Sequence, residues 1–234
     1  MIPFPFEHLR AGLPQRPGFH YARRYRNTAV LIPLIEKHDG IHLLFEQRAD
    51  GIRQAGEVCF PGGMMDSEDS DPCQTAIRET VEELGLRPDK IEILGRMDIL
   101  LTVMGLTVAP VVARVSMDTL DELSPNPDEV ARIFTLPLAW FARNPPEIHT
   151  IQIMAHPVIK KRNGEREVLL PAEALGLPEH YSRPWGGVRH PVLFWSSPEG
   201  MIWGITAEII QALLRITETF MNFSGDDKDP KNVG

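Results

Sequence analysis

The chain has 234 residues and carries 24 Lys and Arg against 32 Asp and Glu, which gives a formal net charge of −8 at pH 7. This length allows one or two domains and a large core, and we interpret the chain as one domain with extensions. An acidic surface does not favour approach to phosphates, so the charge argues against general binding of nucleic acids or anionic membranes. A polyphosphate substrate would instead need a metal ion and local arginines.

The first half of the chain predicts several strands around one helix. Asp39-Gly40 is a hairpin signal between two apolar segments. A short strand then leads into a glycine loop at Gly62 and Gly63, and a helix follows this loop. The strands are expected at residues 28–36, 41–47, 57–60, 91–97, 99–103 and 107–115, and an acidic loop is expected at 118–129.

The second half predicts a hairpin, a loop and a final helix. Asn163-Gly164 predicts a tight turn, with strands at 151–159 and 167–170 on either side. Residues 175–191, rich in Pro, Gly, Trp and His, are expected to form an ordered loop or a lid. Apolar residues at helical spacing predict a packed amphipathic helix over 207–220. The polar residues 224–234 show no periodicity and are expected to be disordered.

Cysteine usage and hydropathy predict a cytoplasmic protein. Cys59 and Cys73 are the 2 cysteines, and we interpret them as buried structural thiols without a disulfide framework. The 8 histidines lack the spacing of a zinc site. Residues 1–8 have neither the basic start nor the apolar run of a secretory signal. The most apolar stretch, 99–115, is interrupted and too short for a membrane span, so two strands explain it better.

The ends of the helix that follows the glycine loop can be placed from local signals. Asp71 can accept hydrogen bonds from the first free N–H groups, and Pro72 fits the first helical position. Gly85 can adopt the left-handed conformation that closes a helix. Helical periodicity then predicts one packed face, formed by Cys73, Ile77, Thr80, Val81 and Leu84.

Three glutamates, Glu79, Glu82 and Glu83, fall on the side of this helix opposite the packed face. Glu79 and Glu83 are four residues apart, so their repulsion is unfavourable unless a cation or a raised pKa relieves it. A hard cation with oxygen ligands relieves it best. A solvated helix face is the alternative interpretation. The adjacent Arg78 and the glycine loop, which can present bare backbone to a ligand, favour the cation site.

The segment from Gly63 to Leu86 resembles the Nudix box: Gly, five residues, an acid, seven residues, then Arg-Glu-apolar-any-Glu-Glu-any-Gly-apolar. In this chain Asp69 stands where the general pattern has Glu, and eight residues rather than seven precede Arg78. Both departures resemble the coenzyme A pyrophosphatase branch of the family. The likeness extends from about Thr28 to Leu214 and includes Leu43-Leu44, Gln47-Arg48, Arg53, Gly56 and Phe60-Pro61-Gly62-Gly63, but residues 144–190 do not align.

The resemblance implies an α/β protein with a Nudix fold, an α/β/α sandwich around a mixed β-sheet. It implies an N-terminal extension over 1–27, a Nudix domain with a C-terminal helix over 28–221, and a tail over 222–234 that we expect to be disordered.

The resemblance also implies a site that binds Mg²⁺ or Mn²⁺ through Glu79 and Glu83, with Glu82 as a further ligand when a second ion enters. Arg78 is expected to orient Glu79 or to pair with Glu82. Glu79, Glu82 and Glu129 are the candidates for the base that activates water. The candidate substrate contacts are the backbone at Gly62 and Gly63 and the guanidinium groups of Arg48 and Arg53, for which two solvated arginines are the alternative.

The activity that follows is metal-dependent hydrolysis of coenzyme A or acyl-CoA to 3′,5′-ADP and 4′-phosphopantetheine or its acyl derivative. Hydrolysis of ADP-ribose or another nucleoside diphosphate derivative is one alternative, and a Nudix module that binds a nucleotide without cleaving it is another. Retention of Arg78, Glu79, Glu82 and Glu83 favours an enzyme, because a binding module has no evident need for so many like charges together. The expected partner is a small nucleotide of the coenzyme A class, and the sequence leaves monomer and homodimer open.

Overall fold

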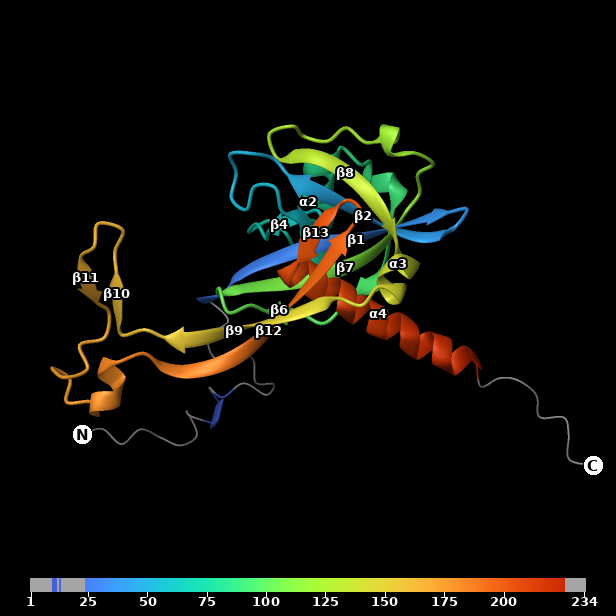
Figure 1. Cartoon of the computed structure of the whole chain (residues 1–234). Coiled ribbons are helices and arrows are strands. Elements are labelled where there is room, and N and C mark those ends of the chain that lie inside the picture. Colours follow the sequence, from blue (N-terminus) through green and yellow to red (C-terminus); the bar gives the residue numbers. More distant parts are fainter. Residues whose placement is uncertain (1–9, 12, 14–23, 226–234) are drawn as a thin grey trace, which may run out of the picture.

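A mixed β-sheet forms the centre of the molecule in a computed structural model, which describes residues 10, 11, 13 and 24–225 (Figure 1). Its main path runs β3–β2–β1–β7–β5, with β4 also paired to β1, β6 to β7 and β8 to β2. The sheet is mixed because β1 and β7 are parallel, whereas β2 and β4 are antiparallel to β1. The strands are β1 (Arg26–Lys37), β2 (Gly40–Arg48), β3 (Val58–Cys59), β4 (Gly62–Met64), β5 (Ile91–Arg96), β6 (Leu100–Leu101), β7 (Leu106–Val115) and β8 (Val130–Pro137).

Helices cover both faces of this sheet. On one face, α2 (Pro72–Leu84) packs Ala76 against a cluster of small and branched side chains of β1 and β7. On the other face, α3 (Leu138–Arg143) and α4 (Gly204–Gly225) bury Phe141, Ile209 and Ile210 against the aromatic side chains of β2 and β8. Removal of this apolar surface from water stabilises the layered arrangement. The predicted α/β/α sandwich is therefore confirmed.

The predicted ends of α2 are confirmed. One carboxylate oxygen of Asp71 accepts from the backbone N–H groups of Cys73 and Gln74 at 2.7 and 3.2 Å. Gly85 has φ 65° and donates its N–H to Val81 O at 2.9 Å. These local signals fix where the helix begins and ends, because each satisfies backbone groups that have no partner inside the helix.

Two predictions upstream and downstream of α2 need correction. Residues Gly62 and Gly63 lie in strand β4, which pairs with β1, and not in a loop. A Cβ on Gly62 would lie 2.3 Å from Ala29 O, so glycine is what lets the two backbones approach. The sequence also did not predict β8, and the acidic segment before it contains a short 3₁₀ turn, Leu120–Glu122.

A two-stranded ribbon projects from the sandwich toward the left of Figure 1. It consists of β9 (Glu147–Ala155) and β12 (Trp185–Ser197), which are antiparallel, and β13 (Gly200–Trp203) joins β12 near the body. Its far end carries a small hairpin, β10 (Val158–Lys160) and β11 (Arg166–Val168). We call residues 147–194 the arm.

The arm corrects the prediction for residues 175–191. Only part of this stretch is irregular, with a 3₁₀ turn at Glu179–Ser182, and β12 starts at Trp185. The glycines and the proline of this stretch are not typical of a strand, which is why the sequence did not predict β12. The register shifts between Gly186 and Val188, and Pro191 lies where β12 pairs only with β9. Such a one-sided strand tolerates proline because one row of its backbone groups needs no partner strand. The Asn163-Gly164 turn is confirmed, although the predicted strand 151–159 is divided between β9 and β10.

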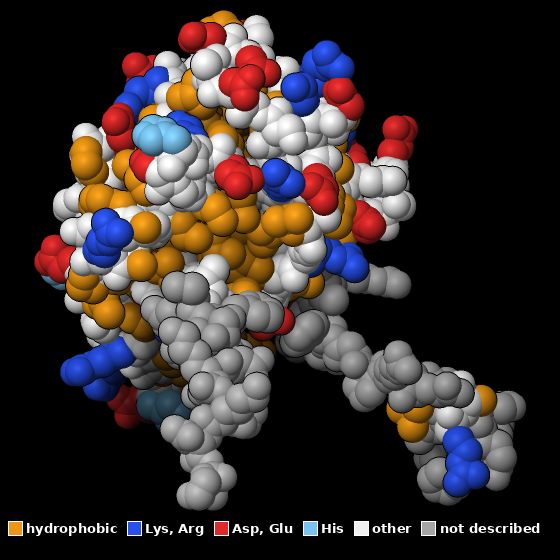
Figure 2. All heavy atoms as spheres, turned by 90° about the vertical axis from the view of Figure 1, so that its right-hand side faces the viewer, with side chains coloured by type: hydrophobic (Ala, Val, Ile, Leu, Met, Phe, Trp, Pro, Cys, Tyr) orange, Lys and Arg blue, Asp and Glu red, His pale blue; other side chains and the backbone are white. Residues whose placement is uncertain are grey.

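The C-terminal helix is confirmed and is longer than predicted, since Ser224 and Gly225 still belong to α4. The rest of the predicted tail, 226–234, lies outside the described residues, as does most of the predicted N-terminal extension. No helix in the described part of the chain is long and apolar enough to cross a membrane. Figure 2 shows apolar side chains gathered near the middle of the face that lies on the right in Figure 1, with charged side chains around them.

Candidate functional site

The predicted acidic residues of α2 differ in their surroundings. Glu83 is buried, with 5% of its surface exposed, and its Oε2 accepts from Gly62 N–H at 2.8 Å. The alternative interpretation, that the three glutamates form one solvated helix face, is therefore wrong for Glu83. The physical reason is that α2 packs against β4 as well as against β1 and β7, so more than one of its sides is covered. Glu82 is exposed, as expected.

Gly63 and Glu79 are in close contact. A Cβ added to Gly63 would lie 2.4 Å from the carboxyl carbon of Glu79, closer than two such atoms can approach. A side chain at position 63 would therefore displace the Glu79 carboxylate. The contact places the backbone of β4 directly beside a carboxylate of α2, which is the arrangement that the glycine pair and the helix acids predicted together.

Arg78 is the centre of a network of ion pairs. Its Nη1 donates to Glu79 Oε1 at 2.7 Å and to Glu82 Oε2 at 3.3 Å, so both of its predicted pairings are present. Its Nη2 donates to Asp69 Oδ2 and to Met64 O, each at 3.0 Å. The hydrogen bond from Arg78 lowers the pKa of Asp69 to about 2. Arg78 therefore connects the acid of the loop with two acids of the helix.

Glu46, on β2, is a further acid that the sequence analysis missed. It is 1% exposed, its Oε1 accepts from Cys59 Sγ at 3.3 Å, and its Oε2 has no hydrogen-bond partner among the described residues. Burial raises the pKa of both Glu46 and Glu83, and the charge of Glu46 raises the pKa of Glu83 further. An acid directly after the apolar run Leu43–Phe45 was the available signal.

Arg48 and Glu129 also act on this group of acids. The positive charge of Arg48 acts to lower the pKa of Glu46 and of Glu83. The negative charge of Glu129 acts to raise the pKa of Glu46. Arg48 Nε donates to the backbone oxygen of Arg53 at 3.0 Å, so the Arg48 side chain lies against the backbone at Arg53. The Arg53 side chain is exposed, and the structure gives no contact between it and the acids.

The donors at this site fit a hard cation. The described residues contain no group of three His, Cys, Asp or Glu side chains already arranged as metal ligands. Arg78 donates to Glu79, and the Gly62 N–H donates to Glu83. Carboxylates are nevertheless the ligands that Mg²⁺ and Mn²⁺ prefer, and the unpartnered, buried Oε2 of Glu46 is an oxygen that a cation would satisfy. We call Glu46, Glu79, Glu82 and Glu83 the acid cluster.

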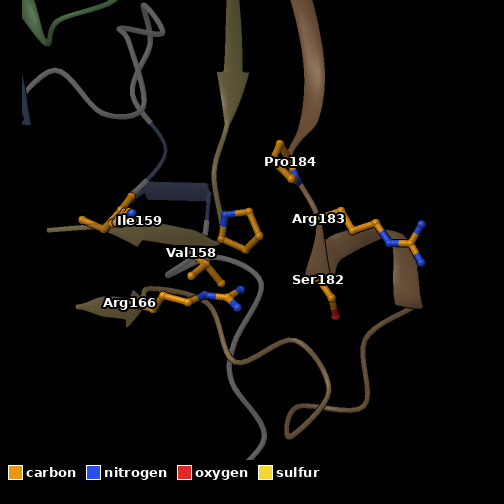
Figure 3. A pocket seen from close by; sticks show the side chains of 8 residues that line it. Val158, Ile159, Arg166, Ser182, Arg183 and Pro184 are labelled. Carbon is orange, nitrogen blue, oxygen red and sulfur yellow. The ribbon is translucent and has the colours of Figure 1, made fainter. Parts of the chain in front are cut away.

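A hollow of about 390 Å³ lies elsewhere, on the arm (Figure 3). Val158 and Ile159 of β10, Arg166 of β11 and Ser182–Pro184 contribute to its lining. Arg183 is engaged by Glu179 at 2.5 Å. None of the site residues predicted from the sequence lines this hollow, so we do not assign the predicted chemistry to it.

Comparison with known proteins gives one family. The family model described as "NUDIX domain" matches residues 25–169. An uncharacterized Nudix hydrolase NudL of Pectobacterium atrosepticum is 38% identical over 122 residues, 52% of this chain and 62% of that protein. The peroxisomal coenzyme A diphosphatase NUDT7 of Mus musculus is 39% identical over 126 residues, 53% of this chain and 52% of that protein.

The matches to these two relatives span less than two thirds of their length. A longer match is to an uncharacterized NudL of Photorhabdus laumondii, which is 33% identical over 192 residues, 80% of this chain and 83% of that protein. Among solved structures, the Nudix hydrolase RenU of M. smegmatis matches with a TM-score of 0.43 and 23% identity, covering 51% of this chain and 74% of that one.

Proposed function

Because the chain belongs to the Nudix family, we propose that it is a metal-dependent diphosphate hydrolase that acts on coenzyme A or acyl-CoA. The products would be 3′,5′-ADP and 4′-phosphopantetheine or its acyl derivative. The observation that carries the proposal is the acid cluster beside the glycines of β4, since a hard cation with oxygen ligands relieves the repulsion among such carboxylates.

The residues divide into ligands, a positioning residue and candidate bases. Glu79 and Glu83 would hold Mg²⁺ or Mn²⁺, and Glu82 would join when a second ion enters. A bound ion neutralises diphosphate oxygens and lowers the pKa of a bound water. Arg78 positions Glu79 through its 2.7 Å hydrogen bond. Glu79, Glu82 and Glu129 remain the candidates for the base that receives the proton of the attacking water.

The substrate class rests on two kinds of support. A relative that shares 39% identity over half of this chain is named a coenzyme A diphosphatase, and the Gln47-Arg48 and Arg53 segments resemble that branch. The guanidinium groups of Arg48 and Arg53 would receive phosphate groups of the substrate. ADP-ribose is the second candidate substrate. A Nudix module that binds a nucleotide without cleaving it is the alternative to an enzyme. Cys59 and Cys73 are free thiols, which suit a reducing compartment such as the cytoplasm.

A substrate panel tests the proposal. The purified chain would be incubated with Mg²⁺ and, separately, with coenzyme A, acetyl-CoA, ADP-ribose, NADH and diadenosine polyphosphates, and the products identified by mass. We expect 3′,5′-ADP from the first two substrates and loss of turnover on chelation. Faster cleavage of ADP-ribose would move the activity to that substrate. Binding of nucleotide without any product would support the non-catalytic module.

A further inference from the structure

Glu46 has no role in the chemistry described so far, although it is the most deeply buried acid of the cluster. Its Oε1 accepts from the thiol of Cys59, which is a weak donor, and its Oε2 has no hydrogen-bond partner among the described residues. Burial of an ionised carboxylate is strongly unfavourable when its oxygens are left unsatisfied. Glu46 therefore needs either a proton or a cation.

The neighbours of Glu46 favour the cation. The negative charges of Glu129 and Glu79 act on Glu46, its own charge acts on Glu83, and the positive charge of Arg48 opposes them. Arg48 directs its Nε to the backbone oxygen of Arg53 instead.

We propose that Glu46 supplies a carboxylate ligand, from the sheet, to the cation that Glu79 and Glu83 of α2 bind. The proposal rests on the proposed function. Glu46 lies opposite Cys59 across β2 and β3, and Gly62, three residues after Cys59, donates its N–H to Glu83, so the segment that leads into β4 connects the strand of Glu46 with the helix acids. A shared cation would satisfy Oε2 and offset the repulsion among three close carboxylates.

Direct measurement of Mn²⁺ binding tests this inference without any substrate. Free Mn²⁺ would be followed by electron paramagnetic resonance during titration of the full chain and of Glu46→Gln, Glu46→Leu and Glu83→Gln. Glu92→Gln is the matched control, because Glu92 is an exposed acid of β5. We expect Glu46→Gln, Glu46→Leu and Glu83→Gln each to weaken Mn²⁺ binding by about tenfold or more, and the control to bind like the wild type.

The melting temperature without Mn²⁺ separates a lost ligand from a damaged fold. Removal of a buried charge should leave apo Glu46→Gln at least as stable as the wild type, while its stabilisation by Mn²⁺ shrinks. Mn²⁺ affinity within twofold of wild type in both Glu46 variants, with a clear loss in Glu83→Gln, would overturn the role of Glu46 and leave the proposed function in place. A wild-type chain that binds no Mn²⁺ would overturn both.

Discussion

At the scale of single residues, the site depends on contacts that tolerate almost no change of size. Gly62 and Gly63 are held against Ala29 O and the Glu79 carboxylate, and the Gly62 N–H donates to Glu83. Arg78 meets four partners with a planar fork that lysine lacks. A substitution of Gly62 should therefore disturb the pairing of β4 with β1, whereas a substitution of Gly63 should act mainly on the position of the Glu79 carboxylate.

The first prediction concerns Glu83 as a cation ligand. Glu83→Gln keeps the shape of the side chain but removes its charge, so kcat should fall by about a thousandfold, which corresponds to roughly 4 kcal/mol. Steady-state kinetics with coenzyme A and Mg²⁺ measure this effect, and thermal melting shows that the variant is folded. A kcat within tenfold of the wild type would contradict the assignment, and Glu92→Gln should behave as the wild type.

A second residue-scale prediction concerns the 3′-phosphate, by which coenzyme A differs from its dephospho form. The surface is acidic overall, so this group needs a local cation, and Arg48 and Arg53 are the arginines that we propose to supply it. A charge-assisted contact of about 1.5 to 3 kcal/mol corresponds to roughly ten- to a hundredfold in kcat/KM. We expect coenzyme A to be cleaved at least about tenfold more efficiently than dephospho-coenzyme A.

Variants locate that contact. Arg48→Ala or Arg53→Ala should narrow the difference between the two substrates, whereas Mn²⁺ affinity should stay unchanged. Equal efficiency of the wild-type chain on both substrates would remove the role proposed for the two arginines and favour a substrate of the ADP-ribose type.

At the scale of elements, α2 is the part that the sequence determines best and the part on which the site depends most. Its start is fixed by the Asp71 carboxylate and its end by the left-handed Gly85, next to Ser124. Both signals are local in sequence, which is why they could be read without the structure. The burial of Glu83 could not, because it follows from the packing of α2 against β4.

Loss of the N-terminal cap gives the prediction at this scale. Asp71→Ala removes the acceptor for two backbone N–H groups, so the free energy of unfolding should fall by about 1 kcal/mol. Urea denaturation measures the change, and Asp71→Asn, which retains a capping oxygen, is the matched control. Equal stability of the Ala and Asn variants would show that the cap contributes nothing.

At the scale of the whole molecule, buried acids make stability depend on pH. The pKa values of Glu46 and Glu83 are raised from 4.5 by burial, so above pH 4.5 the unfolded chain releases protons that the folded chain retains. Stability without metal should therefore fall as the pH rises from about 5 to about 8. Thermal melting in chelator measures it, and millimolar Mg²⁺ should offset most of the fall.

The double variant Glu46→Gln/Glu83→Gln is the control for this pH dependence. It should melt at nearly the same temperature across the same pH range and respond little to Mg²⁺. A wild-type chain whose melting temperature rises steadily over that range would contradict the prediction. Carboxylates with a lowered pKa, such as Asp69, titrate below this pH range and do not mask the effect.

Periodicity and end signals are local, so the sequence predicts α2, α4 and the helix acids, whereas the layered fold follows from the resemblance to the Nudix family. The sequence did not predict β8 or β12, the strand that starts at Trp185. Strand β12 tolerates Pro191 and the bulge at Gly186 because it pairs there with β9 alone. Sequence reasoning also missed Glu46, whose partners Cys59 and Glu83 come from other elements. Tertiary packing decides each of these three cases.

Ala155 pairs with Trp185 at the outer end of the ribbon formed by β9 and β12, and this pairing has an evolutionary consequence. Residues 156–184 leave and rejoin the ribbon at neighbouring positions, so insertions or deletions within them need not displace β9, β12 or the sandwich. Residues 156–184 can thus diverge in length and composition faster than the acid cluster. Relatives that share the acid cluster are therefore expected to differ mainly in the segment that corresponds to residues 156–184.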